Sequence, residues 1–215
     1  MKNKTAVLLL SGGIDSTTLL AKLSNEDYSI IAISFNYGQK HTIELAYAKK
    51  NAKKYNVKSH HIIQLDKNLF QTSALVNKNL EITDFKKSNL PTGNVNVYVP
   101  FRNLLFISTA LSLAESFNSQ EVYLAFNKED RNNFWDCTPD FVTQLNTISL
   151  SNTLIKIKTP FINWPKSEVI RLAKTLNVNL EDTITCYQPK NEIECGVCLS
   201  CLTKIDAFKK LEEKS

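Results

Sequence analysis

Glycine and proline are scarce in this chain, with 5 and 6 occurrences among 215 residues. This low content excludes collagen-like and low-complexity sequences. The shares of hydrophobic and charged residues, 43% and 22%, are ordinary for a globular protein. A chain of this length can bury most of its apolar surface, so we expect it to fold on its own.

Arginine is also scarce, because Arg102, Arg131 and Arg171 are the only three among 26 basic residues. The net charge of +5 therefore comes from lysines, which are spread along the chain. Nucleic-acid-binding proteins more often gather arginine and lysine in stripes with aromatic residues between them. We expect no direct nucleic-acid partner.

Long apolar runs are missing near the N-terminus. The run at residues 6–10 is shorter than the roughly 7 to 15 residues of a signal-peptide core. It is also far below the roughly 20 residues of a membrane helix. We expect no membrane partner and a cytoplasmic location, where the five cysteines should not be counted as disulfides.

Strand and helix patterns alternate along the first part of the chain. Aliphatic and β-branched runs at residues 5–10, 28–35 and 59–63 are typical of buried strands. Apolar residues at helical spacing separate them, from residue 15 onward and again at Leu45, Ala48, Ala52 and Tyr55. This alternation predicts an α/β fold with a Rossmann-like, doubly wound parallel sheet.

The pattern changes further along the chain. Residues 66–97 lack periodicity and contain Pro91 and Gly93, which predicts a loop. Helix patterns follow near residues 104–114, after Thr138-Pro139 and after Pro165, with strands at residues 121–126 and 156–160. A C-terminal helix is predicted to carry its apolar residues on one side, namely Leu202, Ile205, Phe208 and Leu211.

The most informative glycines lie in the string Ser-Gly-Gly-Ile-Asp-Ser-Thr-Thr at residues 11–18, between a predicted strand and a predicted helix. Gly12 and Gly13 permit a close backbone approach, and the free amides at the start of a helix attract anions. The string lacks the lysine of a Walker A loop and the spacing of a dinucleotide fingerprint. An ordinary turn, capped by Asp15 and Ser16, is the alternative interpretation.

Four cysteines near the C-terminus have the spacing of a metal site: Cys186, Cys195, Cys198 and Cys201. Four thiolates can surround one tetrahedral zinc ion, and such a closed site is structural because no position is left for a substrate. An iron–sulfur cluster and a redox pair are the alternatives.

Elsewhere, Arg102 and Asn103 precede a predicted helix and are candidates for nucleotide or carboxylate contacts.

The glycine string resembles the signature of the PP-loop ATP pyrophosphatases, which have an adenine nucleotide alpha hydrolase-like fold. The resemblance implies ATP with magnesium, AMP transfer to a substrate oxygen, and Asp15, Ser16 and Arg102 as catalytic residues. For Asp15, orienting the loop amides and helping to hold magnesium both remain open. The implied ATP-binding residues are Leu10, Ser11, Gly12, Gly13, Ile14, Asp15, Ser16, Thr17, Thr18, Leu19 and Leu20. We divide the chain into a PP-loop ATP-binding domain, residues 1–180, and a zinc-binding subdomain, residues 181–215.

Further segments match one branch of that family in order. They are Tyr37-Gly38-Gln39-Lys40-His41 with Glu44, Val99-Pro100-Phe101-Arg102-Asn103, Asn127 with Asp130, Asp136-Cys137, Lys166, and the cysteine tail. Their order resembles the 7-cyano-7-deazaguanine synthases of the queuosine precursor pathway. The resemblance implies a homodimeric ligase with one zinc ion per chain. Its substrates would be 7-carboxy-7-deazaguanine, ammonium and ATP, and its substrate contacts would be Tyr37, Gln39, His41, Asn103, Asn127 and Asp136.

Some residues depart from the pattern of that branch, namely Ala125, residues 132–135 and Thr138. A related enzyme that passes the same or a similar acid to a different acceptor is therefore an alternative. A tRNA-thiolating enzyme is another, although only Cys137 is left to carry sulfur. A zinc-stabilised module that binds a nucleotide without catalysis is the third.

Overall fold

A computed structural model describes residues 4–86 and 96–213 of the chain. Within these residues, five parallel strands form one sheet in the order β3-β2-β1-β4-β5. The strands are β1 (Thr5–Leu9), β2 (Ser29–Asn36), β3 (Ser59–Gln64), β4 (Glu121–Tyr123) and β5 (Lys156–Lys158). In β1, the side chains of Ala6, Val7 and Leu8 are fully buried, as expected for a central strand covered on both faces.

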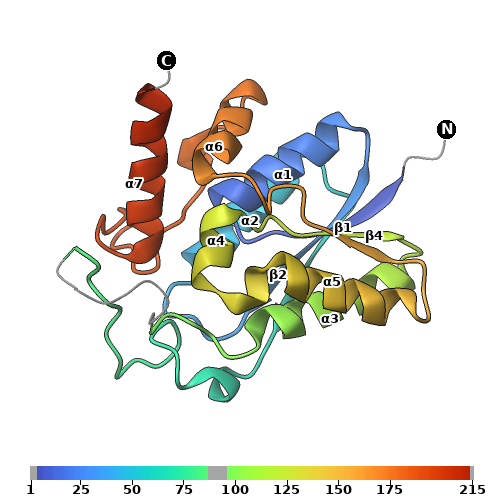
Figure 1. Cartoon of the computed structure of the whole chain (residues 1–215), viewed down its shortest axis with the longest axis horizontal. Helices are drawn as coiled ribbons and strands as arrows, with labels where there is room; N and C mark the ends of the chain where they lie inside the picture. Colours follow the sequence, from blue (N-terminus) through green and yellow to red (C-terminus); the bar gives the residue numbers. More distant parts are fainter. Residues whose placement is uncertain (1–3, 87–95, 214–215) are drawn as a thin grey trace.

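Helices cover both faces of this sheet (Figure 1). The helices are α1 (Ile14–Asn25), α2 (Ile43–Lys54), α3 (Arg102–Ser116), α4 (Lys128–Asn133), α5 (Pro139–Leu150), α6 (Lys166–Thr175) and α7 (Leu199–Glu212). Short 3-10 helices lie at η1 (Lys67–Phe70), η2 (Trp135–Cys137) and η3 (Leu180–Asp182). One apolar core joins α1, α2 and α6 to the sheet, and a second joins α3 and α5 to the opposite face. The predicted doubly wound α/β fold is confirmed.

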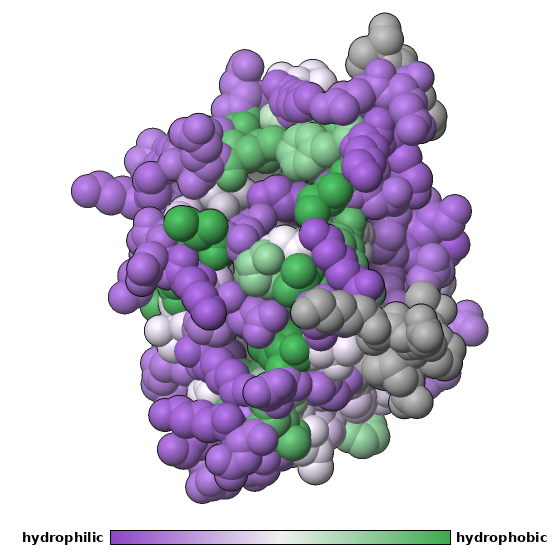
Figure 2. Space-filling model, turned by 90° about the vertical axis from the view of Figure 1, so that its left-hand side faces the viewer, coloured by the Kyte–Doolittle hydropathy of each residue, from purple (hydrophilic) through white to green (hydrophobic). Residues whose placement is uncertain are grey.

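The strand order reverses beside β1. The chain runs from β1 outward through β2 to β3, and then returns to place β4 on the other side of β1. In such sheets, ligands bind at the carboxyl ends of the strands where the order reverses. The loop that follows β1 and the loop that follows β4 meet at this point. Figure 2 views this side of the molecule, where apolar surface is exposed inside a rim of hydrophilic side chains.

Two predicted strands are shorter than the sequence suggested. β4 ends at Tyr123 instead of residue 126, and β5 ends at Lys158 instead of residue 160. The pairing of β4 with β5 ends at Tyr123 and Lys158, where β5 itself ends, and the Leu124 amide makes a last hydrogen bond to the Lys158 carbonyl at 2.9 Å. Residues 66–86 form loop structure apart from η1, as expected, whereas Pro91 and Gly93 lie outside the described residues.

The C-terminal helix α7 packs against α6, as Figure 1 shows at the edge of the α/β unit. Phe208 and Leu211 pack on a small core that Ile14, Ile170 and Ala207 form. The prediction that Ile205 shares this apolar side is wrong, since its side chain is 39% exposed. A spacing of three residues drifts around a helix with 3.6 residues per turn, which turns Ile205 away from the contact.

The apolar content of the helices also bears on membranes. Within residues 4–86 and 96–213, no helix combines the length and the hydropathy that crossing a bilayer requires.

Candidate active site and metal centre

The loop between β1 and α1 is closed by its own serines. The Ser16 hydroxyl accepts a hydrogen bond from the Ser11 amide at 3.2 Å and donates one to the Gly13 carbonyl at 3.2 Å. Gly13 is the N-cap residue of α1, and no side chain caps that helix. The interpretation of Asp15 and Ser16 as caps is therefore wrong. The first amides of α1 remain available to an anion.

Gly12 brings this loop against the backbone of α2. Its φ is +82°, and a Cβ atom built on it would lie 2.3 Å from the Glu44 carbonyl oxygen and 2.8 Å from the Ala48 nitrogen. Both contacts are with backbone atoms, which cannot move aside as a flexible side chain can. Only glycine fits here. The packing of Gly12 on α2 therefore fixes the loop between β1 and α1, which we call the phosphate-type loop.

A cavity of about 290 Å³ opens beside the loop. Residues from the loop, from the ends of β2 and β4, from α3, α4 and α6, and from the tail line it together. They include Leu10, Ser11, Gly13, Asp15, Ser16, Tyr37, Gln39, His41, Glu44, Arg102, Asn103, Asp130, Lys166, Cys186 and Tyr187. Many sequence-predicted site residues are therefore gathered in one place.

Next to the phosphate-type loop, the cavity carries a cluster of charged side chains around the buried Lys166. The Lys166 ammonium donates a hydrogen bond to the Asp15 carboxylate, and the Lys166 backbone amide donates to Glu129 at 2.9 Å. Burial lowers the pKa of Lys166, but the carboxylates of Asp15 and Asp130 outweigh it and raise the pKa above its ordinary value. Burial, followed by the charge of Asp15, raises the pKa of Asp130 to about 6. This region therefore holds a permanent cation beside a carboxyl group that titrates near neutrality.

Arg102 lies on the opposite side, at the start of α3. Its guanidinium lies 5.8 Å from the ring centroid of Tyr37 and 5.9 Å from that of Phe106. It also contacts the Tyr37 hydroxyl at 3.5 Å. Its pKa is raised: burial opposes the charge, but Tyr37 and other acidic groups favour it. Arg102 is thus a fixed cation that faces the cavity.

Other predicted residues have structural roles in the fold. Asn127 caps α4 by accepting hydrogen bonds from the amides of Glu129 and Asp130. Asp136 is buried and does not line the cavity. Gly12, Ile14, Thr17, Thr18, Leu19 and Leu20 also lie outside the lining, and of these Leu19 and Leu20 are fully buried in the core under α1. Nothing in the geometry tests their assignment to ATP or substrate, which stays a prediction.

Several cavity residues were not assigned a role from the sequence. Lys166, Asp130 and Glu44 occur in the matched segments, but nothing local shows that they face a ligand. Tyr187 also lines the cavity, although the sequence pointed only to its neighbour Cys186, as a metal ligand. One local signal was present for Lys166, which is the first residue of α6. A cation is unfavourable at the N-terminus of a helix, so a lysine there indicates a nearby anion that compensates for it.

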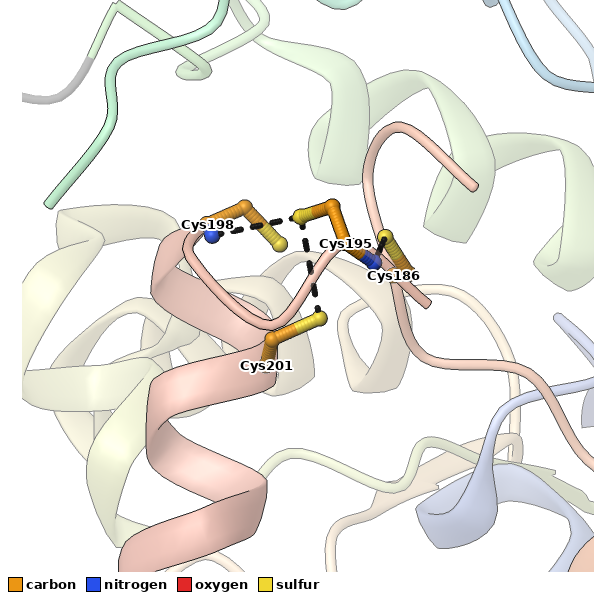
Figure 3. A group of neighbouring side chains, drawn as sticks. All are labelled: Cys186, Cys195, Cys198 and Cys201. Atoms are coloured by element: carbon orange, nitrogen blue, oxygen red, sulfur yellow. Dashed lines mark hydrogen bonds between the residues drawn. The ribbon is translucent and has the colours of Figure 1, made fainter. Parts of the chain in front are cut away.

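The four tail cysteines converge on one point, from the segment before α7 and from its first turn (Figure 3). Their sulfur atoms all lie within 4.8 Å of one another, and those of Cys195 and Cys201 are 3.9 Å apart. Tetrahedral zinc with Zn–S bonds of about 2.3 Å requires sulfur atoms about 3.8 Å apart. The Cys195 amide donates to Cys186 at 3.2 Å, and the Cys198 amide donates to Cys195 at 3.4 Å. The group therefore has the geometry and the donors of a closed metal site.

Comparison with known sequences identifies a family. The family model of queuosine biosynthesis protein QueC matches residues 5–212. The chain is 38% identical, over 216 residues, to 7-cyano-7-deazaguanine synthase from Rickettsia rickettsii (strain Sheila Smith), with 96% of this chain and 95% of that protein covered. It is also 38% identical, over 212 residues, to the synthase from Rickettsia bellii (strain OSU 85-389), with 96% and 94% covered.

Solved structures share the architecture at low sequence identity. NMN synthetase from Francisella tularensis superposes with a TM-score of 0.53 at 18% identity, covering 97% of this chain and 78% of that one. A predicted subunit of tRNA methyltransferase from Methanocaldococcus jannaschii gives a TM-score of 0.51 at 19% identity, covering 80% and 74%. These similarities show the fold alone.

Proposed function

The chain belongs to the family of queuosine biosynthesis protein QueC, and we propose that it is an ATP-dependent ligase that converts 7-carboxy-7-deazaguanine and ammonia to 7-cyano-7-deazaguanine. The relatives that carry the synthase name match it at 37–38% identity over 96% of its length. One observation supports the chemistry most directly. The same cavity is lined by the phosphate-type loop and by two cations, the buried Lys166 and the half-buried Arg102.

The reaction begins with activation of the substrate carboxylate. One carboxylate oxygen attacks the α-phosphorus of ATP, AMP is transferred, and pyrophosphate leaves. The amides at the start of α1 and the Lys166 ammonium stabilise the negative charge that develops on the departing phosphates. Arg102 offers a bidentate donor to the carboxylate or to the nucleotide.

Ammonia then attacks the acyl carbon, AMP leaves, and an amide forms. Asp130 lines the cavity, and its pKa of about 6 suits a carboxylate that accepts the proton released by the nitrogen. Transfer of a second AMP to the amide oxygen makes that oxygen a leaving group. Loss of AMP and of the remaining nitrogen protons leaves the nitrile.

The cofactors follow from the donor sets. Zinc suits the four thiolates of the tail, where it would crosslink the segment before α7 to the helix itself. Magnesium, bound with ATP, would neutralise phosphate charge, and Asp15 is the candidate ligand since its Oδ1 is buried without a hydrogen-bond partner.

A homodimer and a cytoplasmic location complete the proposal. Trp135 and Phe101 support self-association, because these rings contact each other with centroids 5.5 Å apart while 49% and 55% of the two residues is exposed. Sedimentation velocity at several protein concentrations tests the dimer.

Mass spectrometry of the reaction products tests the activity. Zinc-loaded protein is incubated with ATP, magnesium, ammonium and 7-carboxy-7-deazaguanine, and Asp15→Asn is the control. The nitrile together with AMP, both absent in the control, is the expected result. AMP transfer to another acceptor would identify the related-enzyme alternative, which the comparisons do not favour. Dependence on tRNA, or no turnover at all, would contradict the proposal.

A further inference from the structure

One wall of the cavity has the surface of a base-binding site. Phe35 and Phe106 stack with ring centroids 3.9 Å apart and planes 5° from parallel. Tyr37 lies 5.6 Å from Phe106, and all three rings line the cavity. Flat aromatic surface of this kind suits a planar heterocycle. The polar groups beside it then decide which heterocycle fits.

Glu44, in the first turn of α2, is a carboxylate that lines the same cavity. Its Oε1 accepts a hydrogen bond from Gln39 Nε2 at 2.9 Å. Gln39 is itself fixed, because it donates to the Phe35 carbonyl at 3.1 Å and accepts from the Tyr37 amide at 2.8 Å. Glu44 is therefore held by a side chain that cannot easily turn away.

The Glu44 carboxylate, which is half-buried, is only partly satisfied by the protein. Within the described part of the chain it forms no ion pair, and its Oε2 receives no hydrogen bond. Arg102 lies over the rings of Tyr37 and Phe106, and its charge only partly offsets the effect of burial on the pKa of Glu44. Burial accordingly raises the pKa of Glu44 to about 7. A carboxylate left open toward a cavity calls for donors on the ligand.

We propose that Glu44 recognises the N1–H and 2-amino donors of the 7-deazaguanine ring, and so selects the substrate. This inference rests on the proposed function. The two donors are adjacent on one edge of the ring, and a carboxylate offers two acceptors with matching spacing. The ring stacks on Phe35, Tyr37 and Phe106, and its 7-carboxylate, on the opposite edge of the ring, points away from Glu44.

The adenine of ATP is the competing occupant. Its corresponding edge presents the N6 amino donor beside the N1 acceptor, and an anionic carboxylate is repelled by that acceptor. A hypoxanthine-type ring has N1–H but lacks the amino group. A comparison of 7-carboxy-7-deazaguanine with its analogue without the 2-amino group therefore isolates the contact between that amino group and Glu44.

Steady-state kinetics of the zinc-loaded enzyme test the inference. The variants are Glu44→Gln and Glu115→Gln, the same chemical change at an exposed position on α3. The acids are 7-carboxy-7-deazaguanine and its analogue without the 2-amino group. Wild type and Glu115→Gln should favour the first acid by roughly 10- to 100-fold in kcat/KM, as a bidentate pair does. Glu44→Gln should reduce this ratio to within about threefold, raise KM for the acid, and leave KM for ATP within about twofold.

Three outcomes would overturn the inference. A raised KM for ATP with an unchanged ratio of the two acids would assign Glu44 to adenine. An unchanged ratio and unchanged KM values would give it a structural role only. If wild type turns over neither acid, the proposed function fails, and that result is read from wild type alone. If Glu44→Gln does not fold, Glu44→Asp keeps the charge, and weaker binding with a retained preference for the 2-amino group is the expected result.

Discussion

Lys166 and Asp15 lie 151 residues apart in the chain, yet their side chains form a buried ion pair at the start of two helices. The Lys166 side chain is 5% exposed and that of Asp15 is 19% exposed. The pair joins α6 to the phosphate-type loop at the point where α1 and α6 pack together. It fixes the loop in addition to the contact that Gly12 makes with α2.

We predict that Lys166→Met lowers the free energy of unfolding by about 3 to 5 kcal/mol, since it leaves the Asp15 charge buried without a partner. The double variant with Asp15→Asn should recover most of this loss, because neither charge remains. Urea denaturation of the two single variants and the double variant measures the coupling. Equal stability of wild type and Lys166→Met would contradict the prediction. All three variants should fail to release pyrophosphate.

Glu44 should make stability depend on pH. Its pKa is raised from 4.5 to about 7, so the folded protein binds this proton more tightly than the unfolded chain does. Its contribution is complete below about pH 4.5 and is lost as the pH rises through about 7.

Relative to wild type, Glu44→Gln should therefore become more stable between pH 4.5 and pH 8.5, by about 1 to 3 kcal/mol. The difference between the two proteins cancels other groups that titrate in this range, such as Asp130. Thermal unfolding across the pH series is the measurement. A difference that does not vary with pH would show that the pKa of Glu44 is not raised in the folded protein.

Removal of one tail thiolate should destroy the metal site. Structural zinc contributes apparent binding of about 10 to 16 kcal/mol, which is comparable to the stability of a whole domain. Cys198→Ser should therefore be largely insoluble, or should bind far less than one zinc ion per chain. Cys137→Ala, which changes the one cysteine outside the cluster, is the matched control and should keep its zinc. A soluble, metal-free and fully active Cys198→Ser protein would refute this role.

The two loop glycines should differ in their tolerance of alanine. Gly12→Ala places a methyl group 2.3 Å from a backbone oxygen at a φ of +82°, whereas the same change at Gly13 meets its nearest neighbour at 3.4 Å. We expect Gly12→Ala to cost about 3 kcal/mol or more, and Gly13→Ala to cost about 1 kcal/mol or less. Chemical denaturation of both variants measures this, and equal losses would contradict the close approach to α2.

The sequence by itself determined what local spacing encodes. The alternation of apolar runs predicted the doubly wound sheet, and the glycine string between a strand and a helix predicted the anion loop. The spacing of Cys186, Cys195, Cys198 and Cys201 predicted a metal group, because three of its ligands lie close together within residues 195–201. The structure confirms the fold and brings the four sulfur atoms together.

Only the tertiary structure decided which distant residues share the site. It paired Lys166 with Asp15, opened Glu44 toward a cavity, and turned Ile205 to solvent. It also made Asn127 the cap of α4 and ended β4 opposite the last residue of β5. The physical reason is that hydrophobic periodicity and turn chemistry act over a few residues. Charge pairing, burial and cavity lining depend instead on which elements the whole sheet brings together.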